Sequence, residues 1–186
     1  DQYGEGALSE CLEARYFYLP DGLVSRIELG SKQVQGIDYA YTLQGWLKDM
    51  NGYRTDVSSD LGQDGFAGTN GAFGKDASAL MLQYYKTDYR PIKGSNFYNK
   101  VSTTSTDLYN GNISAISSNS YPTPPLLKSF RYDKLNRLKL MQTATLGSTQ
   151  WTNLGDQYGA DYRYDYNGNL LSLRRKNQTG VLMHDI

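Results

Sequence analysis

Residues 162–173 read Tyr-Arg-Tyr-Asp-Tyr-Asn-Gly-Asn-Leu-Leu-Ser-Leu. Tyrosines at alternate positions place their side chains on one face of an extended strand. The Asn-Gly pair that follows is the dipeptide most favoured in tight hairpin turns, because both residues tolerate positive φ angles. Since an apolar run comes next, the stretch predicts a β-hairpin with its turn at Asn167 and Gly168.

The same spacing recurs along the chain. Aligned on Tyr164, the unit is a tyrosine, three residues, a glycine or asparagine, one residue and an aliphatic side chain. The four full copies have these anchors: Tyr18 and Gly22, Tyr41 and Gly45, Tyr132 and Asn136, Tyr164 and Gly168. A fifth copy keeps only its second half, around Gly111, and has Asp107 at the tyrosine position. Such recurrence indicates an architecture of stacked hairpin units.

The spacing of the copies also indicates where the pattern is interrupted. Tyr18 and Tyr41 lie 23 residues apart, whereas Tyr132 and Tyr164 lie 32 apart, which predicts an insertion around 143–156. Between Leu47 and Asp107 the repeat unit is not found. The Gly, Asp and Ser residues within this interval predict an inserted loop that is held against the hairpins. The chain is therefore divided into an upstream connection (1–15), hairpins (16–51), an inserted loop (52–79) and further hairpins (80–186).

Other local signals are weaker. We expect a strand to resume at 80–85, and only 8–15 and 75–82 give faint helix signals. The proline-rich segment Tyr121–Pro125 lacks backbone donors, which predicts an extended connection between two hairpins.

The composition favours the same fold and excludes several classes of function. The 186 residues include 17 Tyr and 19 Gly, which suits pleated strands joined by tight turns. With 19 basic and 19 acidic residues, the chain has no net charge to attract nucleic acid or an acidic membrane. Cys11 is the single cysteine, so no intrachain disulfide can form, and we expect it to be a small, partly buried apolar residue. No apolar run approaches the roughly 20 residues that span a bilayer. The chain begins at Asp1 without an initiator methionine, which suggests upstream processing or truncation.

The units at Tyr132–Leu138 and Tyr164–Leu170 resemble the YD repeat of Rhs proteins. Stretches 16–30, 34–51 and 80–92 are also similar to Rhs proteins of Bacteroidetes-type bacteria, and the likeness spans most of residues 16–175. Asp follows the tyrosine only in the last two copies; Leu19 and Thr42 occupy that position in the first two. The resemblance leaves open how those first two turns are hydrogen bonded.

The resemblance implies a spiral of β-hairpins that forms part of a hollow shell or barrel, as in bacterial Rhs toxins, toxin-complex cocoons and the YD barrel of teneurins. It implies a secreted or cell-surface bacterial protein, whose shell encloses a C-terminal toxin or cargo domain. The expected partners are the remaining repeats of the same polypeptide, the enclosed domain, and secretion machinery or surface glycans. The self-cleaving acidic site that follows the repeats in this family is not visible in the sequence.

The sequence contains only weak candidates for a catalytic or metal-binding site. His184, the only histidine, lies in a segment without a motif. Residues 68–75 fail the phosphate-loop pattern, which needs glycine at Thr69 and a hydroxyl at Asp76. Asp56, Asp60 and Asp64 are weighed as Ca²⁺ ligands, but their spacing of four favours a solvated acidic loop. We therefore expect a non-enzymatic protein without metal or cofactor.

Two surfaces remain open to alternative interpretations. Five basic residues are interleaved with Phe130 and Tyr132, and their alternation favours a solvated hairpin face over a nucleic-acid surface; they are Lys128, Arg131, Lys134, Arg137 and Lys139. The tyrosine rows, such as Tyr39 with Tyr41, are expected to stack from copy to copy. The alternative is that exposed tyrosines stack on sugar rings, which would make the chain a carbohydrate-binding or adhesive surface module.

Overall fold

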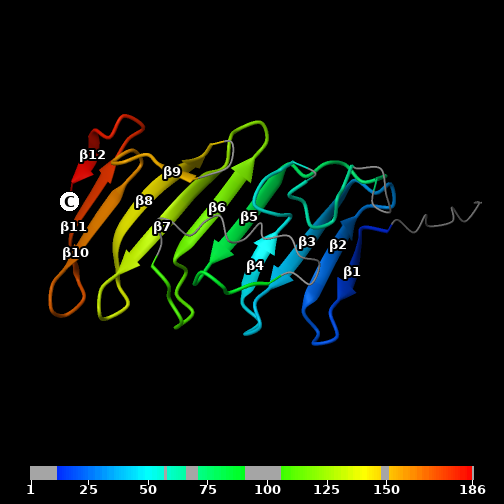
Figure 1. Ribbon diagram of the computed structural model, residues 1–186, viewed down its shortest axis with the longest axis horizontal. Helices are drawn as coiled ribbons and strands as arrows, with labels where there is room; N and C mark the ends of the chain where they lie inside the picture. Colours follow the sequence, from blue (N-terminus) through cyan, green and yellow to red (C-terminus); the bar gives the residue numbers. More distant parts are fainter. Residues whose placement is uncertain (1–11, 57, 66–70, 91–105, 148–150, 186) are drawn as a thin grey trace, which may run out of the picture.

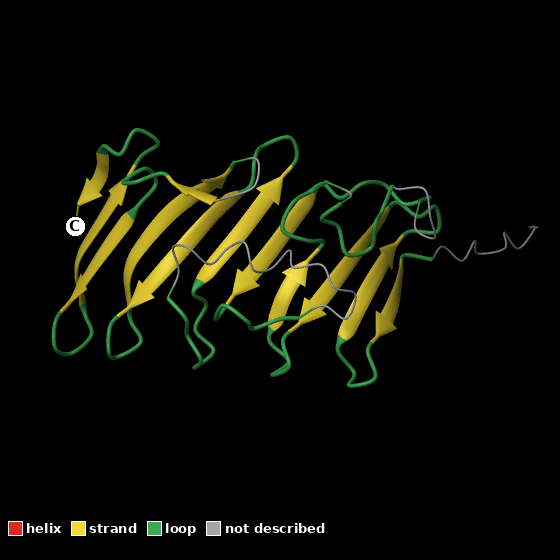
Figure 2. Ribbon diagram, in the orientation of Figure 1, coloured by secondary structure: helices red, strands yellow, loops and turns green. Residues whose placement is uncertain are grey.

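The computed structural model describes residues 12–56, 58–65, 71–90, 106–147 and 151–185. Within these ranges the chain forms twelve strands and no helix (Figure 1; Figure 2). The strands are β1 (Ala14–Tyr18), β2 (Val24–Leu29), β3 (Gln35–Tyr41), β4 (Leu47–Met50), β5 (Ser78–Gln83), β6 (Ala115–Ser120), β7 (Leu126–Tyr132), β8 (Leu138–Leu146), β9 (Trp151–Asn153), β10 (Ala160–Tyr164), β11 (Leu170–Lys176) and β12 (Leu182–Asp185). The prediction of an all-β fold built from hairpins is confirmed.

All twelve strands belong to one antiparallel sheet in which neighbours along the chain are neighbours in space. The order runs from β1 to β12, and β8 pairs with both β9 and β10. The sheet is open rather than closed, because β1 pairs only with β2 and β12 only with β11 among the described strands. Whether further copies continue the sheet into a shell therefore remains a prediction.

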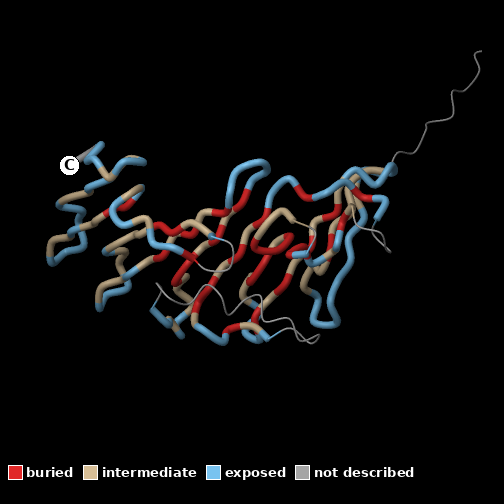
Figure 3. Tube along the Cα trace, turned by 45° about the horizontal axis from the view of Figure 1, so that its top comes forward, coloured by how far each residue is buried: buried red, intermediate tan, exposed pale blue. Residues whose placement is uncertain are grey.

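The buried core lies on one face, in the middle of the sheet (Figure 3). Residues that pair across adjacent strands form a row on this face: Asp49, Met81, Ser117, Leu127 and Ala144. Tyr53 and Trp151 complete the apolar cluster around Met81 and Leu127. Many of the other buried side chains on the sheet are polar, so the sheet buries little apolar surface for its size.

The loop between β4 and β5 is held against this face, as the sequence predicted. Thr55 N donates to Asn119 Oδ1 at 2.8 Å, and Gln35 forms a parallel bridge with Gly74. Arg26 on β2 contacts Asp64 of the loop at 2.8 Å. Residues 52–56, 58–65 and 71–77 thus cover part of the sheet as an irregular layer.

Several local predictions need correction. The faint helix signal at 75–82 is wrong, because Ser78–Gln83 forms β5, close to the predicted strand at 80–85. Ala14 and Arg15 belong to β1, which contradicts a helix there, and residues 8–11, with Cys11, lie outside the described residues.

The two predicted interruptions of the repeat adopt defined structures. Residues 121–125 connect two repeat hairpins, but they form a turn rather than an extended segment, with Thr123 N donating to Ser120 O at 2.8 Å. The extra residues at 143–156 include the end of β8 and β9, which pairs back on β8.

Large exposed apolar side chains concentrate in the two terminal hairpins. Tyr16, Phe17 and Tyr18 are exposed on β1, and Leu171 and Met183 are 62% and 69% exposed on β11 and β12. Soluble proteins rarely expose apolar groups in such clusters unless another element covers them. None of the described residues forms a helix long and apolar enough to cross a membrane.

Candidate functional site

The four full copies of the repeat form the same turn, at the same end of the sheet (Figure 1). In the last copy, Asp165 N donates to Asn169 O at 3.0 Å and Gly168 N donates to Asp165 O at 3.2 Å. The same pair of backbone hydrogen bonds closes the turns that begin at Leu19, Thr42 and Asp133. We call this series of turns, together with the turn around Gly111, the turn row.

The common spacing within each copy follows from backbone geometry. Gly168 has a φ of 91° and Asn136 a φ of 60°, a left-handed conformation that glycine and asparagine adopt most easily. Asn167 is not among the positive-φ residues, so the turn is not the two-residue form that the Asn-Gly pair suggested. Each copy instead combines a turn with a one-residue bulge beside its tyrosine.

The residue after the tyrosine caps the turn where its side chain allows it. Asp133 Oδ1 accepts hydrogen bonds from the backbone nitrogens of Leu135 and Arg137, at 2.9 and 3.0 Å. The hydrogen bond from Arg137 N is the main cause of the lowered pKa of the Asp133 carboxyl. Asp165 has the same role, and its pKa is lowered chiefly by the Asn169 side chain. Both aspartates therefore remain charged well into the acid range.

The two turns without this aspartate use other caps. Thr42 Oγ1 accepts from Trp46 N at 3.2 Å, which replaces one of the carboxylate contacts. Leu19 has no acceptor, but Asp21 Oδ1 accepts from Leu23 N at 3.2 Å within the same turn. Loss of the aspartate therefore changes the cap and preserves the turn.

The tyrosine of each later copy reaches back to the copy before it. Tyr41 Oη donates to the carbonyl oxygen of Val24 at 3.0 Å, and Tyr164 Oη donates to that of Leu138 at 2.9 Å. Val24 and Leu138 are the aliphatic residues of the preceding copies. The repeat unit thus contains both the donor and the acceptor of the bond that joins it to its neighbours.

The fifth copy is complete, and the sequence alignment misplaced its tyrosine. Tyr84 Oη donates to Leu47 O at 2.9 Å, and Tyr132 Oη donates to Ile113 O at 2.9 Å. Tyr84 therefore occupies the position that the alignment gave to Asp107. Asp107 Oδ1 instead accepts from Lys86 N at 2.6 Å. The tyrosine and the turn glycine, Gly111, are separated by an insertion, which no fixed spacing could reveal.

Four successive junctions consequently carry the same hydroxyl-to-carbonyl bond, and we call this series the tyrosine ladder. Its donors and acceptors are Tyr41 to Val24, Tyr84 to Leu47, Tyr132 to Ile113 and Tyr164 to Leu138. Buried or half-buried hydrogen bonds of this kind each contribute about 1 kcal/mol. The ladder fixes the register of one hairpin on the next.

A second contact accompanies the ladder at two junctions. The residue five positions after one tyrosine packs on the tyrosine of the next copy: the rings of Trp46 and Tyr84 are 4.9 Å apart. The Arg137 guanidinium lies 4.8 Å from the ring of Tyr164, and its Nη1 donates to Asp165 O at 3.0 Å. These contacts join neighbouring turns as well as neighbouring strands.

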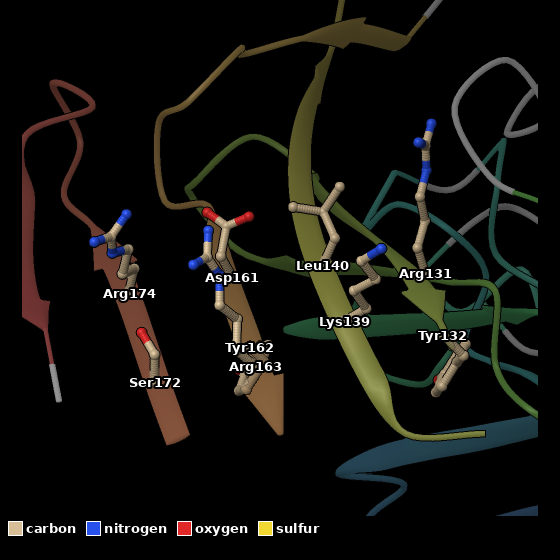
Figure 4. A pocket seen from close by; sticks show the side chains of 9 residues that line it. All are labelled: Arg131, Tyr132, Lys139, Leu140, Asp161, Tyr162, Arg163, Ser172 and Arg174. Carbon is tan, nitrogen blue, oxygen red and sulfur yellow. The ribbon is translucent and has the colours of Figure 1, made fainter. Parts of the chain in front are cut away.

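The structure does not gather the five basic residues of 128–139 into one surface. Lys128 and Arg131 lie on opposite faces of β7, and Arg137 binds Asp133 at 2.7 Å. Arg131 and Lys139 border a groove of about 450 Å³ across β7, β8, β10 and β11 (Figure 4). The other residues that line this groove are Tyr132, Leu140, Asp161, Tyr162, Arg163, Ser172 and Arg174. Four of the lining residues are basic, Arg131, Lys139, Arg163 and Arg174, and one, Asp161, is acidic. The choice between a solvated hairpin face and a nucleic-acid surface stays a prediction.

The acidic loop contradicts the prediction of a solvated segment. Asp60 and Asp64 are buried, and Asp76 joins them, whereas Asp56 pairs with Arg54 at 2.8 Å. The signal missed in the sequence is Asp76, because it is 12 residues beyond Asp64 and lies just before β5. We call Asp60, Asp64 and Asp76 the acidic cluster.

The remaining sequence candidates do not converge on a site. His184 pairs through its backbone with Arg175 in the last hairpin, and residues 68–70 of the rejected phosphate-loop pattern lie outside the described residues.

The fold and the contacts between its hairpins define the structural class of the chain, which is an open antiparallel β-sheet made of repeated hairpins. No model of a known protein family matches the chain, and no curated protein matches it.

Proposed function

We propose that this chain is a wall segment of a larger YD-repeat shell of the Rhs type, a secreted or surface protein that encloses a toxin or other cargo domain. The observation that carries the proposal is the tyrosine ladder, which uses one repeated bond at four successive junctions. Such a unit can be added at either end without a new kind of contact.

The two ends of the sheet support a continuation of this kind. Tyr18 is 61% exposed, and the described residues hold no partner for its hydroxyl. Leu170 has the position of Val24 and Leu138 in the last copy, so its carbonyl is the acceptor for a following tyrosine. Exposed apolar side chains on β1, β11 and β12 would be covered by the neighbouring copies.

Containment would then be the mechanism: the hairpins supply wall area and the ladder locks successive turns of the wall. The role requires no catalytic group, metal or cofactor. It requires a chain with enough copies to surround the cargo, and a single open sheet cannot do this alone.

The first test is the mass of the native polypeptide, measured by mass spectrometry of the protein purified from its source. We expect a mass several times the 20.9 kDa of this chain, with peptides of the same repeat on both sides of it. A native mass near 20.9 kDa would overturn the proposal. Limited proteolysis of the intact particle should then cleave the cargo domain only after the shell is opened.

One hollow favours the alternative of a carbohydrate-binding surface. Its volume is about 520 Å³, and it is lined at the turn row by aromatic and charged groups that include Tyr41, Tyr85, Asp21 and Arg90. Tyr85 also stacks on Tyr109, with ring centroids 4.6 Å apart. Binding on a glycan array that is lost on Tyr85→Ala would favour this function. Silence across the array would leave the hollow without a glycan role.

A further inference from the structure

Three aspartates converge beneath the irregular layer that links β4 to β5. Asp60, Asp64 and Asp76 each direct a carboxylate oxygen to one place, where these oxygens all lie within 4.8 Å of one another. All three residues are buried, and Asp64 and Asp76 are only 1% and 5% exposed. Like charges so close together are destabilising unless a cation or a proton lies among them.

The surrounding contacts fix this arrangement against the sheet. Arg26 of β2 binds Asp64 Oδ1 at 2.8 Å and also donates to Asp38 of β3. Gly36 permits this approach, because a Cβ atom there would lie 2.0 Å from Arg26 Nη2 and 2.3 Å from Asp64 Oδ2. The Asp64 carboxylate is therefore held by Arg26 of β2, while the backbone nitrogen of Asp64 donates to Asp60 Oδ2 at 2.5 Å.

The second observation is that carboxylate oxygens in the cluster have no hydrogen-bond partner. Asp64 Oδ2 and both oxygens of Asp76 are buried without a hydrogen-bond partner of good geometry among the described residues, although Gln35 and Asp60 lie close enough to act on Asp76. A buried carboxylate oxygen without a donor or cation costs several kcal/mol in general. Asp76 is more than nine-tenths buried and has both of its oxygens in this condition.

Carboxyl groups outnumber the cations at this buried place. Arg26 pairs with Glu28, Asp38 and Asp64, and Asp60 and Asp76 lie beside Asp64 in the cluster. Of the loop's own cations, Arg54 pairs with Asp56 and Lys75 is exposed.

We propose that Asp60, Asp64 and Asp76 bind one divalent cation, with Ca²⁺ preferred, and that the cation ties the loop to β2 and β3. Hard oxygen ligands and the absence of nitrogen or sulfur donors in the cluster select Ca²⁺ or Mg²⁺ over transition metals. Ca²⁺ is preferred because it accepts irregular geometry and bidentate carboxylates, so backbone carbonyls and water can complete its coordination. The site is independent of any containment role.

A hollow of about 620 Å³ lies beside the cluster, and Asp76 borders it together with Thr55, Asp56, Lys75, Ala77 and Tyr121. The carboxylate oxygens of Asp76 are themselves buried.

The test is calorimetric titration of the EDTA-treated chain with CaCl₂. We expect saturable binding of one Ca²⁺ per chain and a melting temperature that rises with Ca²⁺ concentration. Asp76→Asn should weaken the binding by at least about tenfold. Asp156→Asn, an exposed aspartate outside the loop, should leave it unchanged.

Three results would overturn the proposal. The first is the absence of saturable binding of either Ca²⁺ or Mg²⁺ to the unmodified chain. The second is a melting temperature that does not change at Ca²⁺ concentrations that saturate the binding. The third is equal affinity of the unmodified chain and a folded Asp76→Asn variant, which would place the ion elsewhere. The first two results require no variant, so the proposal can fail even if Asp76→Asn does not fold.

Discussion

At each junction between hairpins, a single phenolic hydroxyl joins one copy of the repeat to a carbonyl of the copy before it. We expect Tyr132→Phe to lower the free energy of unfolding by about 1 kcal/mol, because Ile113 O loses its 2.9 Å donor while packing is retained. Urea unfolding measures the change. Tyr166→Phe is the matched control, since Tyr166 is fully exposed, and it should change nothing. Equal effects of the two substitutions would contradict the ladder.

The turn position requires a left-handed backbone rather than glycine as such. Gly45 has a φ of 77°, and a Cβ atom added there would meet open space, since Leu23 Cδ1 at 4.0 Å is the nearest atom. We expect Gly45→Ala to cost roughly 1 kcal/mol in thermal or urea unfolding. Gly45→Asn should cost less, because Asn136 already occupies the equivalent position. A larger cost for Asn would mean that side-chain size, not φ, decides the residue.

The buried carboxyl groups give stability a pH dependence of definite sign. The pKa of Asp76 is raised to about 8 and that of Asp38 to about 6, so the folded state binds more protons than the unfolded state. In EDTA, the free energy of unfolding should therefore fall as the pH rises through about 6 and then about 8. The charged groups that act on Asp76 are Asp60 and Asp64, and Arg26 pairs with Asp64 and Asp38.

Asp76→Asn should remove the upper part of this dependence, measured as urea midpoints across the same pH range. Asp133 and Asp165 act with the opposite sign, because their lowered pKa values make their contribution disappear only in acid. A profile that is flat between neutral and alkaline pH in EDTA would contradict the raised pKa of Asp76.

At the scale of one element, a buried ion pair joins β4 to the segment that follows β5, where the insertion between Tyr84 and Gly111 begins. Lys48 Nζ lies 2.8 Å from Asp88 Oδ1, both side chains are almost fully buried, and Asp88 Oδ2 accepts from Tyr84 N. Lys48→Ala should lower the free energy of unfolding by about 3 kcal/mol or more, because Asp88 would keep a buried charge. Lys139 has the same position in its copy but is exposed. Lys139→Ala should therefore have little effect in the same chemical denaturation experiment.

The sequence predicted the hairpins well because their determinants are local. A tyrosine, a capping aspartate and a left-handed residue lie within five positions, so Tyr132–Asn136 and Tyr164–Gly168 specify their own turns. The full extent of the fifth copy could not be predicted from such a local pattern, because Tyr84 and Gly111 are far apart in the chain. The acidic cluster was missed for the same reason: Asp76 meets Asp60 and Asp64 only after the loop packs on β2 and β3.

At the scale of the whole molecule, β1 and β12 each pair on one side only among the described strands, so each presents an open edge. Such edges pair readily with other strands, so we expect the isolated chain to self-associate as its concentration rises. Sedimentation velocity measures this directly. Tyr16→Lys on β1 should weaken the association, whereas Leu43→Lys in an exposed turn should not. A chain that remains monomeric at all concentrations would show that its edges need no neighbour.

The split fifth copy shows that this architecture tolerates length variation at one defined place. Tyr84 and Ile113 keep the ladder bonds of this copy, although most of the residues between Tyr84 and Gly111 have no counterpart in the other copies. An engineered epitope or protease site placed in that interval would therefore leave the pairing of β5 with β6 intact. In a protein made of repeated units, the interval between Tyr84 and Gly111 is thus an insertion site, where one copy can carry a sequence that the other copies lack.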